Sequence, residues 1–276
     1  MTAVPRQRIA LLLQYLGTSF YGWQRQPHHP SVQQTIEEAI ALITGHPVVL
    51  HGAGRTDTGV HAAGQVAHFD VTSPIPPERW AKVLNSYLPS GILIRESVAV
   101  DQQWHARFTA TWRRYRYTLY TAELPNLFVK DYSWHYYYGN FCADRVHEAL
   151  QPLLGEQDLV ALQRAGSTRP HARVTVQEAK CWRQGDFVYI EVQCSGFLYG
   201  MMRLLVGQLV EVGRGAQTGA DFTQRWQEQR RDEVKYAAPP QGLCFLGVGY
   251  PENPFTEASR RFLTLSLDQA GQVLLV

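Results

Sequence analysis

Hydrophobic and polar positions in the first hundred residues change period several times, and each period predicts an element. The apolar run from Arg8 to Gln14 predicts a buried strand, and the apolar stripe that follows Ser31, a candidate N-cap, predicts a helix. The predicted elements are strand 8–14, helix 31–44, strand 48–51, strand 65–71, helix 76–87 and strand 91–100. Their order, β-α-β-β-α-β, is the signature of a ferredoxin-like split unit.

The second part of the chain repeats this order with one additional helix. Between residues 113 and 120, side chains alternate with the period of two that is typical of a strand. The further predictions are strand 113–120, helix 144–154, a hairpin of strands 174–182 and 187–194, helices 197–212 and 221–231, and strand 244–250. We therefore predict an α+β fold of two ferredoxin-like halves, with antiparallel sheets joined side by side and an active-site cleft between them. The halves are expected at 1–105 and 106–250, and residues 251–276 form a C-terminal tail without an assigned role.

Composition restricts the class of protein. With 45% hydrophobic and 18% charged residues among 276, the chain is neither disordered nor a coiled coil. No apolar stretch approaches the roughly 20 residues that a membrane span needs. Cys142, Cys181, Cys194 and Cys244 lie far apart, which disfavours a zinc site or redox pair and predicts free thiols in a reducing cytoplasm. A net charge of +2 argues against coating nucleic acid by bulk attraction, although it says nothing about where the charges lie.

The densest cluster of reactive residues is the loop 51–62, between two predicted strands. It fails as a phosphate cradle, since Asp57 stands where the dinucleotide fingerprint needs glycine and would repel phosphate. Asp57-Thr58-Gly59 is also the tripeptide of acid proteases, but the chain has no second copy and Arg55 would oppose a shared proton. The third interpretation is an ionised aspartate, held by a bidentate pair with Arg55, that serves as nucleophile or base. An Arg55–Asp57 pair that only staples the loop fits these residues equally well.

Several motifs together resemble the tRNA pseudouridine synthase A (TruA) family. The segment Gly54-Arg55-Thr56-Asp57-Thr58-Gly59-Val60-His61 is similar to the family's active-site motif, whose aspartate is catalytic. Other similar blocks, in the family's order, are Tyr21 to Gln26 with Ser31 to Gln33, Gly64 to Phe69, Asn85 to Pro89, His105 to Phe108, Arg113 to Tyr117, Phe197 to Gly207 and Ala238 to Leu243. The chain departs from the family's pattern at Leu16 and at 158–162, which bears on substrate contacts rather than on the chemistry.

The resemblance implies an isomerase that converts uridine to pseudouridine at positions 38, 39 and 40 in the anticodon stem-loop of tRNA, without a cofactor. Asp57 would act on the ribose or the uracil, with Arg55 and Arg203 as further catalytic residues, and Tyr115 would pack against the extruded uracil. Arg203 lies on an otherwise apolar predicted helix, and because a buried charge needs a partner we expect it to pair with Asp57. The resemblance also implies a homodimer.

Arginines are concentrated in segments that suit an RNA partner. Residues 101–120 contain four arginines against Asp101, and arginine interleaved with tyrosine suits phosphate contact combined with base stacking. The candidate RNA-binding residues are Arg25, Arg107, Arg113, Arg114 and Arg116. A solvated strand face with alternating charge is the alternative interpretation. The competing function is a catalytically inactive RNA-binding or chaperone protein of the same fold.

Overall fold

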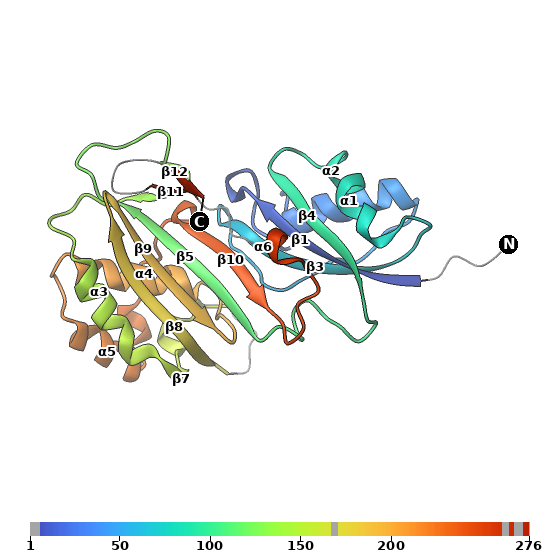
Figure 1. The fold of residues 1–276 in the computed structure, drawn as a ribbon. Helices are drawn as coiled ribbons and strands as arrows, with labels where there is room; N and C mark the ends of the chain where they lie inside the picture. Colours follow the sequence, from blue (N-terminus) through green and yellow to red (C-terminus); the bar gives the residue numbers. More distant parts are fainter. Residues whose placement is uncertain (1–5, 167–170, 261–264, 268–272, 276) are drawn as a thin grey trace. The chain divides into compact units, whose positions relative to one another are not determined.

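The computed structural model describes residues 6–166, 171–260, 265–267 and 273–275, which form two compact units. Within these residues, the first unit contains 6–111 and 245–260, and the second contains 112–166, 171–244 and the two short strands beyond residue 264. Each unit combines a mainly antiparallel sheet with helices (Figure 1), so the α+β class predicted from the sequence is confirmed.

The first unit is built around a central apolar strand. Its elements are β1 (Arg6–Tyr15), η1 (Gly17–Ser19), α1 (Val32–Thr44), β2 (His51–Gly52), β3 (His61–Thr72), η2 (Pro77–Arg79), α2 (Trp80–Asn85), β4 (Ile92–Val100) and α6 (Glu257–Arg260). Strand β1 pairs antiparallel with β3 on one side and with β4 on the other. Ile9, Leu11 and Leu13 are fully buried, which explains the uninterrupted apolar run in the sequence. The order β4-β1-β3 is consistent with the predicted split unit.

The start of α1 follows the predicted capping chemistry. The Ser31 hydroxyl accepts a hydrogen bond from the Gln34 N–H at 3.3 Å, and the helix ends at Gly45, whose φ is +76°. Strand β10 (Leu243–Gly249) lies next to β3, and its residues from 245 onward group with this unit.

The second unit has its helices on one face of the sheet (Figure 1). Its elements are β5 (Trp112–Tyr120), β6 (Trp134–His135), α3 (Ala143–Leu150), η3 (Gln151–Leu153), β7 (Gly155–Asp158), η4 (Val160–Leu162), β8 (Arg173–Gln184), β9 (Phe187–Cys194), α4 (Met201–Gly213), α5 (Gly219–Gln227), η5 (Arg231–Glu233), η6 (Pro240–Gly242), β11 (Leu265–Leu267) and β12 (Val273–Leu275). The strand order β5-β9-β8-β7 is antiparallel throughout, while β6 pairs parallel with β5. This order is consistent with a second split unit.

Three elements differ from those predicted from the sequence. Helix α4 begins at Met201 instead of residue 197, because Gly200 adopts a left-handed conformation with φ of +69°. Strand β2 is limited to two residues. Strand β7 was not predicted, because its four residues are polar or glycine and show no apolar alternation.

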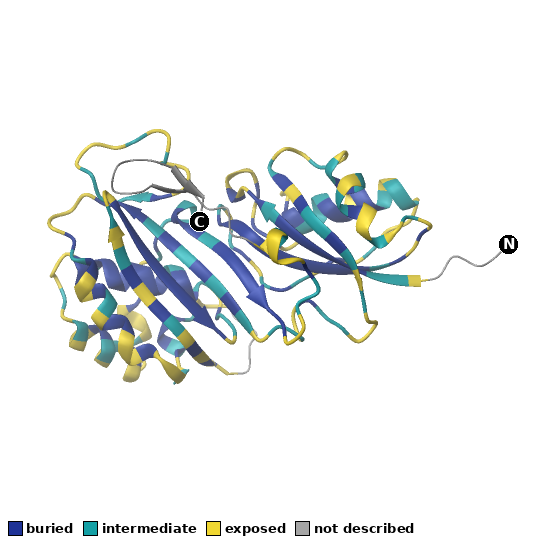
Figure 2. Cartoon of the chain, in the orientation of Figure 1, coloured by how far each residue is buried: buried dark blue, intermediate teal, exposed yellow. Residues whose placement is uncertain are grey.

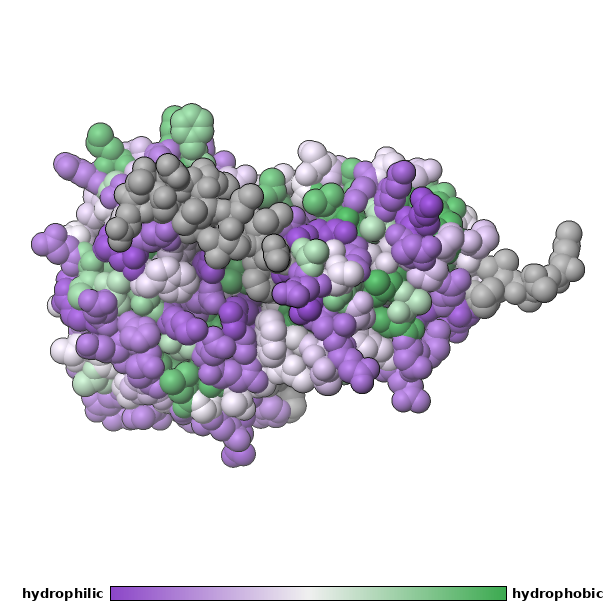
Figure 3. All heavy atoms as spheres, in the orientation of Figure 1, coloured by the Kyte–Doolittle hydropathy of each residue, from purple (hydrophilic) through white to green (hydrophobic). Residues whose placement is uncertain are grey.

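Two neighbouring strands of the second unit, β8 and β9, differ in how far they are buried. Figure 2 shows β9 buried along its whole length, whereas β8 alternates between buried and exposed positions. On the face drawn in Figure 3, hydrophilic residues predominate and hydrophobic ones form small separate groups.

Candidate active site

The loop that carries Asp57 joins β2 to β3, and main-chain hydrogen bonds fix it. The Ala53 N–H donates to the Val66 carbonyl at 2.8 Å, and the Val60 N–H closes a turn onto the Asp57 carbonyl at 3.1 Å. Gly59 has a φ of +80°, in the left-handed region that favours glycine. The loop is therefore a tight turn with Asp57 at its start.

Residues 21–23 pack directly against this loop. The Trp23 N–H donates to the Thr56 carbonyl at 3.1 Å. Gly22 has a φ of +83°, and a Cβ at this position would lie 2.6 Å from the Thr56 carbonyl oxygen and 3.1 Å from the Asp57 carbonyl carbon. Glycine at position 22 thus allows two backbones to approach within a distance that any side chain would prevent.

Two buried polar side chains hold the loop on either side of Arg55. The Gln65 side chain donates from Nε2 to the Gly54 carbonyl at 2.7 Å and accepts from the Gly54 N–H at 3.3 Å. The Tyr15 and Thr56 hydroxyls are 2.8 Å apart and share a hydrogen bond. Because buried hydrogen bonds are costly to leave unmade, these contacts restrain the backbone that leads into Asp57.

The two charged residues of the loop have different surroundings. Asp57 is half-buried and Arg55 is exposed. The predicted bidentate pair of Arg55 with Asp57 stays a prediction. The catalytic role of Arg55 stays a prediction.

Tyr115 and Arg113 lie on the same face of β5. The Tyr115 side chain is 6% exposed, and its ring meets the Phe197 ring at a steep angle, with centroids 4.6 Å apart. Arg113 is 9% exposed and donates from Nη1 to the Ser195 carbonyl at 3.0 Å. A buried arginine is therefore fixed two residues from the tyrosine to which the family resemblance gives a base-packing role.

Arg203 is half-buried on α4, whose other residues are mostly apolar. Its Nε donates to the Ala238 carbonyl at 2.7 Å, and the Ala238 N–H donates to the Arg203 carbonyl at 2.9 Å. Burial raises the pKa of Tyr117 well above its ordinary value, and the nearby positive charge of Arg203 opposes this shift. The predicted pair of Arg203 with Asp57 stays a prediction.

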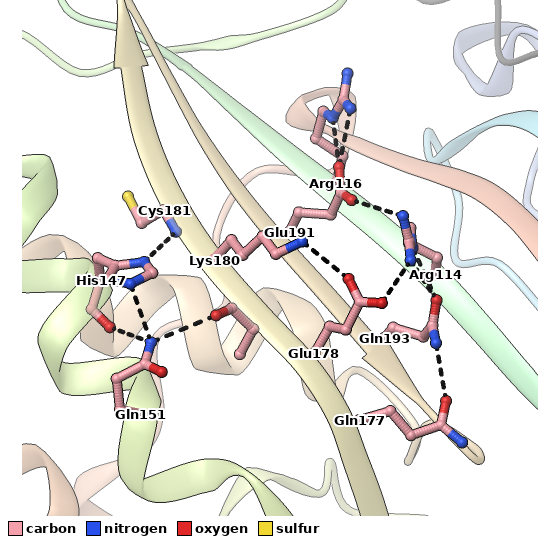
Figure 4. A network of polar contacts seen from close by, with 11 residues as sticks. Arg114, Arg116, His147, Gln151, Gln177, Glu178, Lys180, Cys181, Glu191 and Gln193 are labelled. Atoms are coloured by element: carbon pink, nitrogen blue, oxygen red, sulfur yellow. Dashed lines mark hydrogen bonds and ion pairs between the residues drawn. The ribbon is translucent and has the colours of Figure 1, made fainter.

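Arg114 and Arg116 point to the other face of β5 and contact carboxylates of neighbouring strands (Figure 4). Glu191 lies 3.3 Å from Arg114 Nη1 and accepts from Arg116 Nε at 2.9 Å, while Glu178 accepts from Arg114 Nη2 at 3.1 Å. The Arg116 guanidinium also lies 5.3 Å from the Trp182 ring centroid. Both arginines therefore have protein partners, as the solvated-strand interpretation expects, and their predicted contacts with RNA stay predictions.

The remaining candidate arginines lie in the first unit. Arg25 donates from Nε and Nη2 to the buried carboxylate of Glu37, at 3.0 and 2.7 Å. Arg107 is exposed, and its guanidinium lies 5.6 Å from the ring centroid of Phe108. Their roles in RNA binding also stay predictions.

All four cysteines are free, as the sequence predicts. Burial raises the pKa of Cys181 and of Cys194 to about 12, which makes these two thiols unreactive at neutral pH. Among the described residues, no group of three or more His, Cys, Asp or Glu side chains is arranged to hold a metal ion.

A comparison with protein families identifies the family of the chain. A family model described as tRNA pseudouridine synthase matches residues 11–109 and 149–251 of the chain, including the Asp57 loop. The chain belongs to this family.

Relatives named tRNA pseudouridine synthase A confirm the predicted resemblance. One from Nostoc sp. is 62% identical over 250 residues, which cover 91% of this chain and 89% of the relative. One from Thermosynechococcus vestitus is 57% identical over 266 residues, covering 95% and 94% of the two chains, and one from Synechocystis sp. is 56% identical over 254 residues, covering 92% of each. As a member of the tRNA pseudouridine synthase family, the chain is an isomerase that acts on uridine in tRNA.

Sequence reasoning missed the residues that support the Asp57 loop. Gln65 and Gly22 stand inside blocks that resemble the family, but a resemblance does not show which atoms are in contact. Tyr15 lies outside those blocks.

No described helix has both the length and the apolar character to cross a membrane.

Proposed function

We propose that the chain converts uridine to pseudouridine at positions 38, 39 and 40 of the tRNA anticodon stem-loop, with Asp57 as the essential catalytic residue and without a cofactor. The observation that carries the proposal is the restrained loop: Gly22 and Gln65 hold the backbone around Asp57, in the segment that resembles the family's active-site motif. A carboxylate fixed in this way is pre-organised for one direction of attack.

The reaction needs little from the protein beyond a carboxylate and a protected site. The bond between uracil N1 and ribose C1′ breaks, the uracil turns, and its C5 bonds to C1′ while the proton on C5 leaves and N1 gains one. Nothing is oxidised, and no group is donated from outside. Asp57 supplies the nucleophile or base for these steps.

Tyr115 is proposed to pack against the uracil once it has left the RNA stack. Its buried ring and its contact with Phe197 support this role, because a ring held at a fixed angle offers a rigid apolar surface to a base. Arg203 is proposed to pair with Asp57 and keep it ionised, since an opposite charge lowers the pKa of a carboxyl group. Arg55, exposed beside Asp57, remains the third proposed catalytic residue.

The substrate is proposed to lie along arginine side chains. Arg25, Arg107, Arg113, Arg114 and Arg116 are the proposed contacts to the phosphate backbone, which would position tRNA without reading its sequence. We also propose that the enzyme is a homodimer and works in the cytoplasm with its tRNA substrate.

The experiment is a map of pseudouridine in an unmodified tRNA transcript after incubation with the purified chain. The proposal predicts new pseudouridine at uridines 38, 39 and 40 and at no uridine outside the anticodon stem-loop. Modification confined to another arm of the tRNA would overturn the proposed site. Binding of tRNA without any pseudouridine would favour the competing inactive RNA-binding protein.

A further inference from the structure

A cavity of about 680 Å³ lies in the first unit, in the loop that precedes α1. Its lining combines the guanidinium of Arg25, the imidazoles of His28 and His29, two glutamine amides and two prolines. This volume lies within the range of about 300–1,000 Å³ in which proteins bind small ligands. No carboxylate lines the cavity, so its chemistry suits an anionic or polar aromatic ligand.

Arg25 is held in place by a buried carboxylate. Glu37 is 6% exposed and accepts from Arg25, from the Gln33 side chain at 3.0 Å and from the Leu50 N–H at 2.9 Å. Only Nε and Nη2 of Arg25 take part in this network. Among the described residues Nη1 has no hydrogen-bond partner, so a fixed guanidinium presents one free donor nitrogen to a phosphate oxygen.

An aromatic stack stands at the same loop. The Tyr21 and His29 rings are stacked, with centroids 4.1 Å apart and planes inclined by 17°. Tyr21 is 45% exposed and His29 is also exposed, so the pair is not part of the core. An exposed and pre-formed aromatic stack is the surface on which nucleic-acid bases stack.

This loop is tied to the catalytic loop by the main chain. The Tyr21 N–H donates to the Pro30 carbonyl at 2.9 Å, which holds the two ends of the loop together. The next residue, Gly22, is the one that packs against Thr56 and Asp57. A ligand on the Tyr21–His29 stack would therefore be a close neighbour of the catalytic loop within one unit.

We propose that this cavity, with the Tyr21–His29 stack and the free nitrogen of Arg25, binds a nucleotide of the tRNA strand next to the target uridine. Its base stacks on the Tyr21–His29 pair, and its phosphate accepts a hydrogen bond from Arg25 Nη1. The inference rests on the proposed tRNA anticodon stem-loop as substrate. It assigns a binding role to residues outside the active-site motif.

The test measures kcat, KM and the Kd for unmodified tRNA in Tyr21→Leu and His29→Ala. Each variant is expected to raise KM and Kd about tenfold, the size expected when one base loses its aromatic partner, with kcat at saturating tRNA unchanged. Tyr21→Phe keeps the ring and should restore the wild-type KM. The matched control is His46→Ala, since His46 is exposed in the same unit and lies outside the cavity. Circular dichroism and thermal unfolding establish that each variant is folded.

A second readout places 2-aminopurine at each nucleotide flanking the target uridine. Binding of the wild-type enzyme should quench its fluorescence at one flanking position, and Tyr21→Leu should reduce that quenching. An unchanged KM in both variants, or a lower kcat at unchanged KM, would overturn the inference while leaving the proposed function intact. If the wild-type chain itself formed no pseudouridine, the proposed function would be overturned instead.

Discussion

At position 22 the absence of a side chain lets the backbone pack closely against the Asp57 loop. The Cβ of any other residue would meet the Thr56 carbonyl oxygen at 2.6 Å, far inside van der Waals contact. Because Thr56 precedes Asp57 and the same peptide accepts a hydrogen bond from Trp23, a displacement there would move the Asp57 carboxylate, the proposed catalytic group. Even a small displacement is costly for a carboxylate that is proposed to react with one substrate atom.

Gly22→Ala should therefore lower kcat by at least about tenfold, since a small misplacement of a reacting group can cost about 100-fold in rate. Gly45→Ala is the matched control: Gly45 also has a positive φ, +76°, but nothing lies within 4 Å of its missing Cβ. Both variants should lose about 1 kcal/mol of stability from backbone strain. Equal kcat values in the two variants, measured with saturating tRNA, would contradict the positioning role of Gly22.

The candidate site was predictable from the sequence at the level of motifs but not of contacts. Asp57 and Tyr115 stand in blocks that resemble the family, and the family itself is confirmed. The Arg55–Asp57 pair was predicted from proximity in sequence and stays a prediction. The support from Gln65 to Gly54 spans 11 residues and depends on how β3 leaves the loop, which no local pattern states.

At the scale of elements, the β5–β9–β8 sheet joins residues far apart in sequence into one ionic network (Figure 4). Glu191 is opposite Arg116 in the β5–β9 register and 75 residues away along the chain. Its side chain is 11% exposed, while Glu178 is 40% exposed. Burial should make the Glu191 contacts worth more than those of Glu178, because water screens an exposed pair.

Glu191→Gln should lower the free energy of unfolding by about 2 kcal/mol, because it leaves two half-buried guanidinium groups without the carboxylate between them. Glu178→Gln is the control, with an expected loss below about 1 kcal/mol. Urea unfolding of both variants gives the comparison. Equal losses in the two variants would show that burial does not govern this network.

The predictability of elements followed the strength of their local pattern. Strand β1 and helix α1 were predicted closely because an apolar run and an N-cap define them. Strand β7 was missed, since an edge strand of polar residues is held only by its pairing with β8. The partners of Arg114 and Arg116 were missed for a related reason: strand register is a tertiary property, and alternating charge does not reveal which strand lies opposite.

At the scale of the whole molecule, one buried histidine, His68, should make the stability of the fold depend on pH. His68 on β3 is 1% exposed, and its Nδ1 accepts a hydrogen bond from the Ala106 N–H at 3.2 Å. Burial, together with the nearby His105, Arg8 and His51, lowers the pKa of His68 from 6.5 to about 3. The folded chain therefore keeps His68 neutral over a pH range in which the unfolded chain protonates it.

This difference fixes the direction of the pH dependence. Stability from His68 is complete above pH 6.5 and decreases by about 1.4 kcal/mol per pH unit as the pH falls from 6.5 toward 3, because the unfolded state binds the additional proton. His68→Gln should make the slope shallower by this amount, and the exposed control His46→Gln should leave the slope unchanged. Urea unfolding between pH 7 and pH 5 measures the slopes. The same slope in wild type and His68→Gln would contradict the neutral buried state.

Net charge is the other whole-molecule property that the structure clarifies. The total of +2 conceals 26 basic residues, several of which are paired with carboxylates: Arg8 with Asp70, Arg25 with Glu37, and Arg116 with Glu191. An RNA partner is therefore compatible with a small net charge, because recognition depends on where donors are placed.

The proposed reaction depends most on Asp57, and one substitution tests this dependence. Asp57→Asn preserves side-chain volume and removes the charge, so pseudouridine formation at uridines 38, 39 and 40 of unmodified tRNA should be lost while the Kd for tRNA stays at the wild-type value. Pseudouridine formation by Asp57→Asn at a rate close to that of the wild-type enzyme would contradict the central claim.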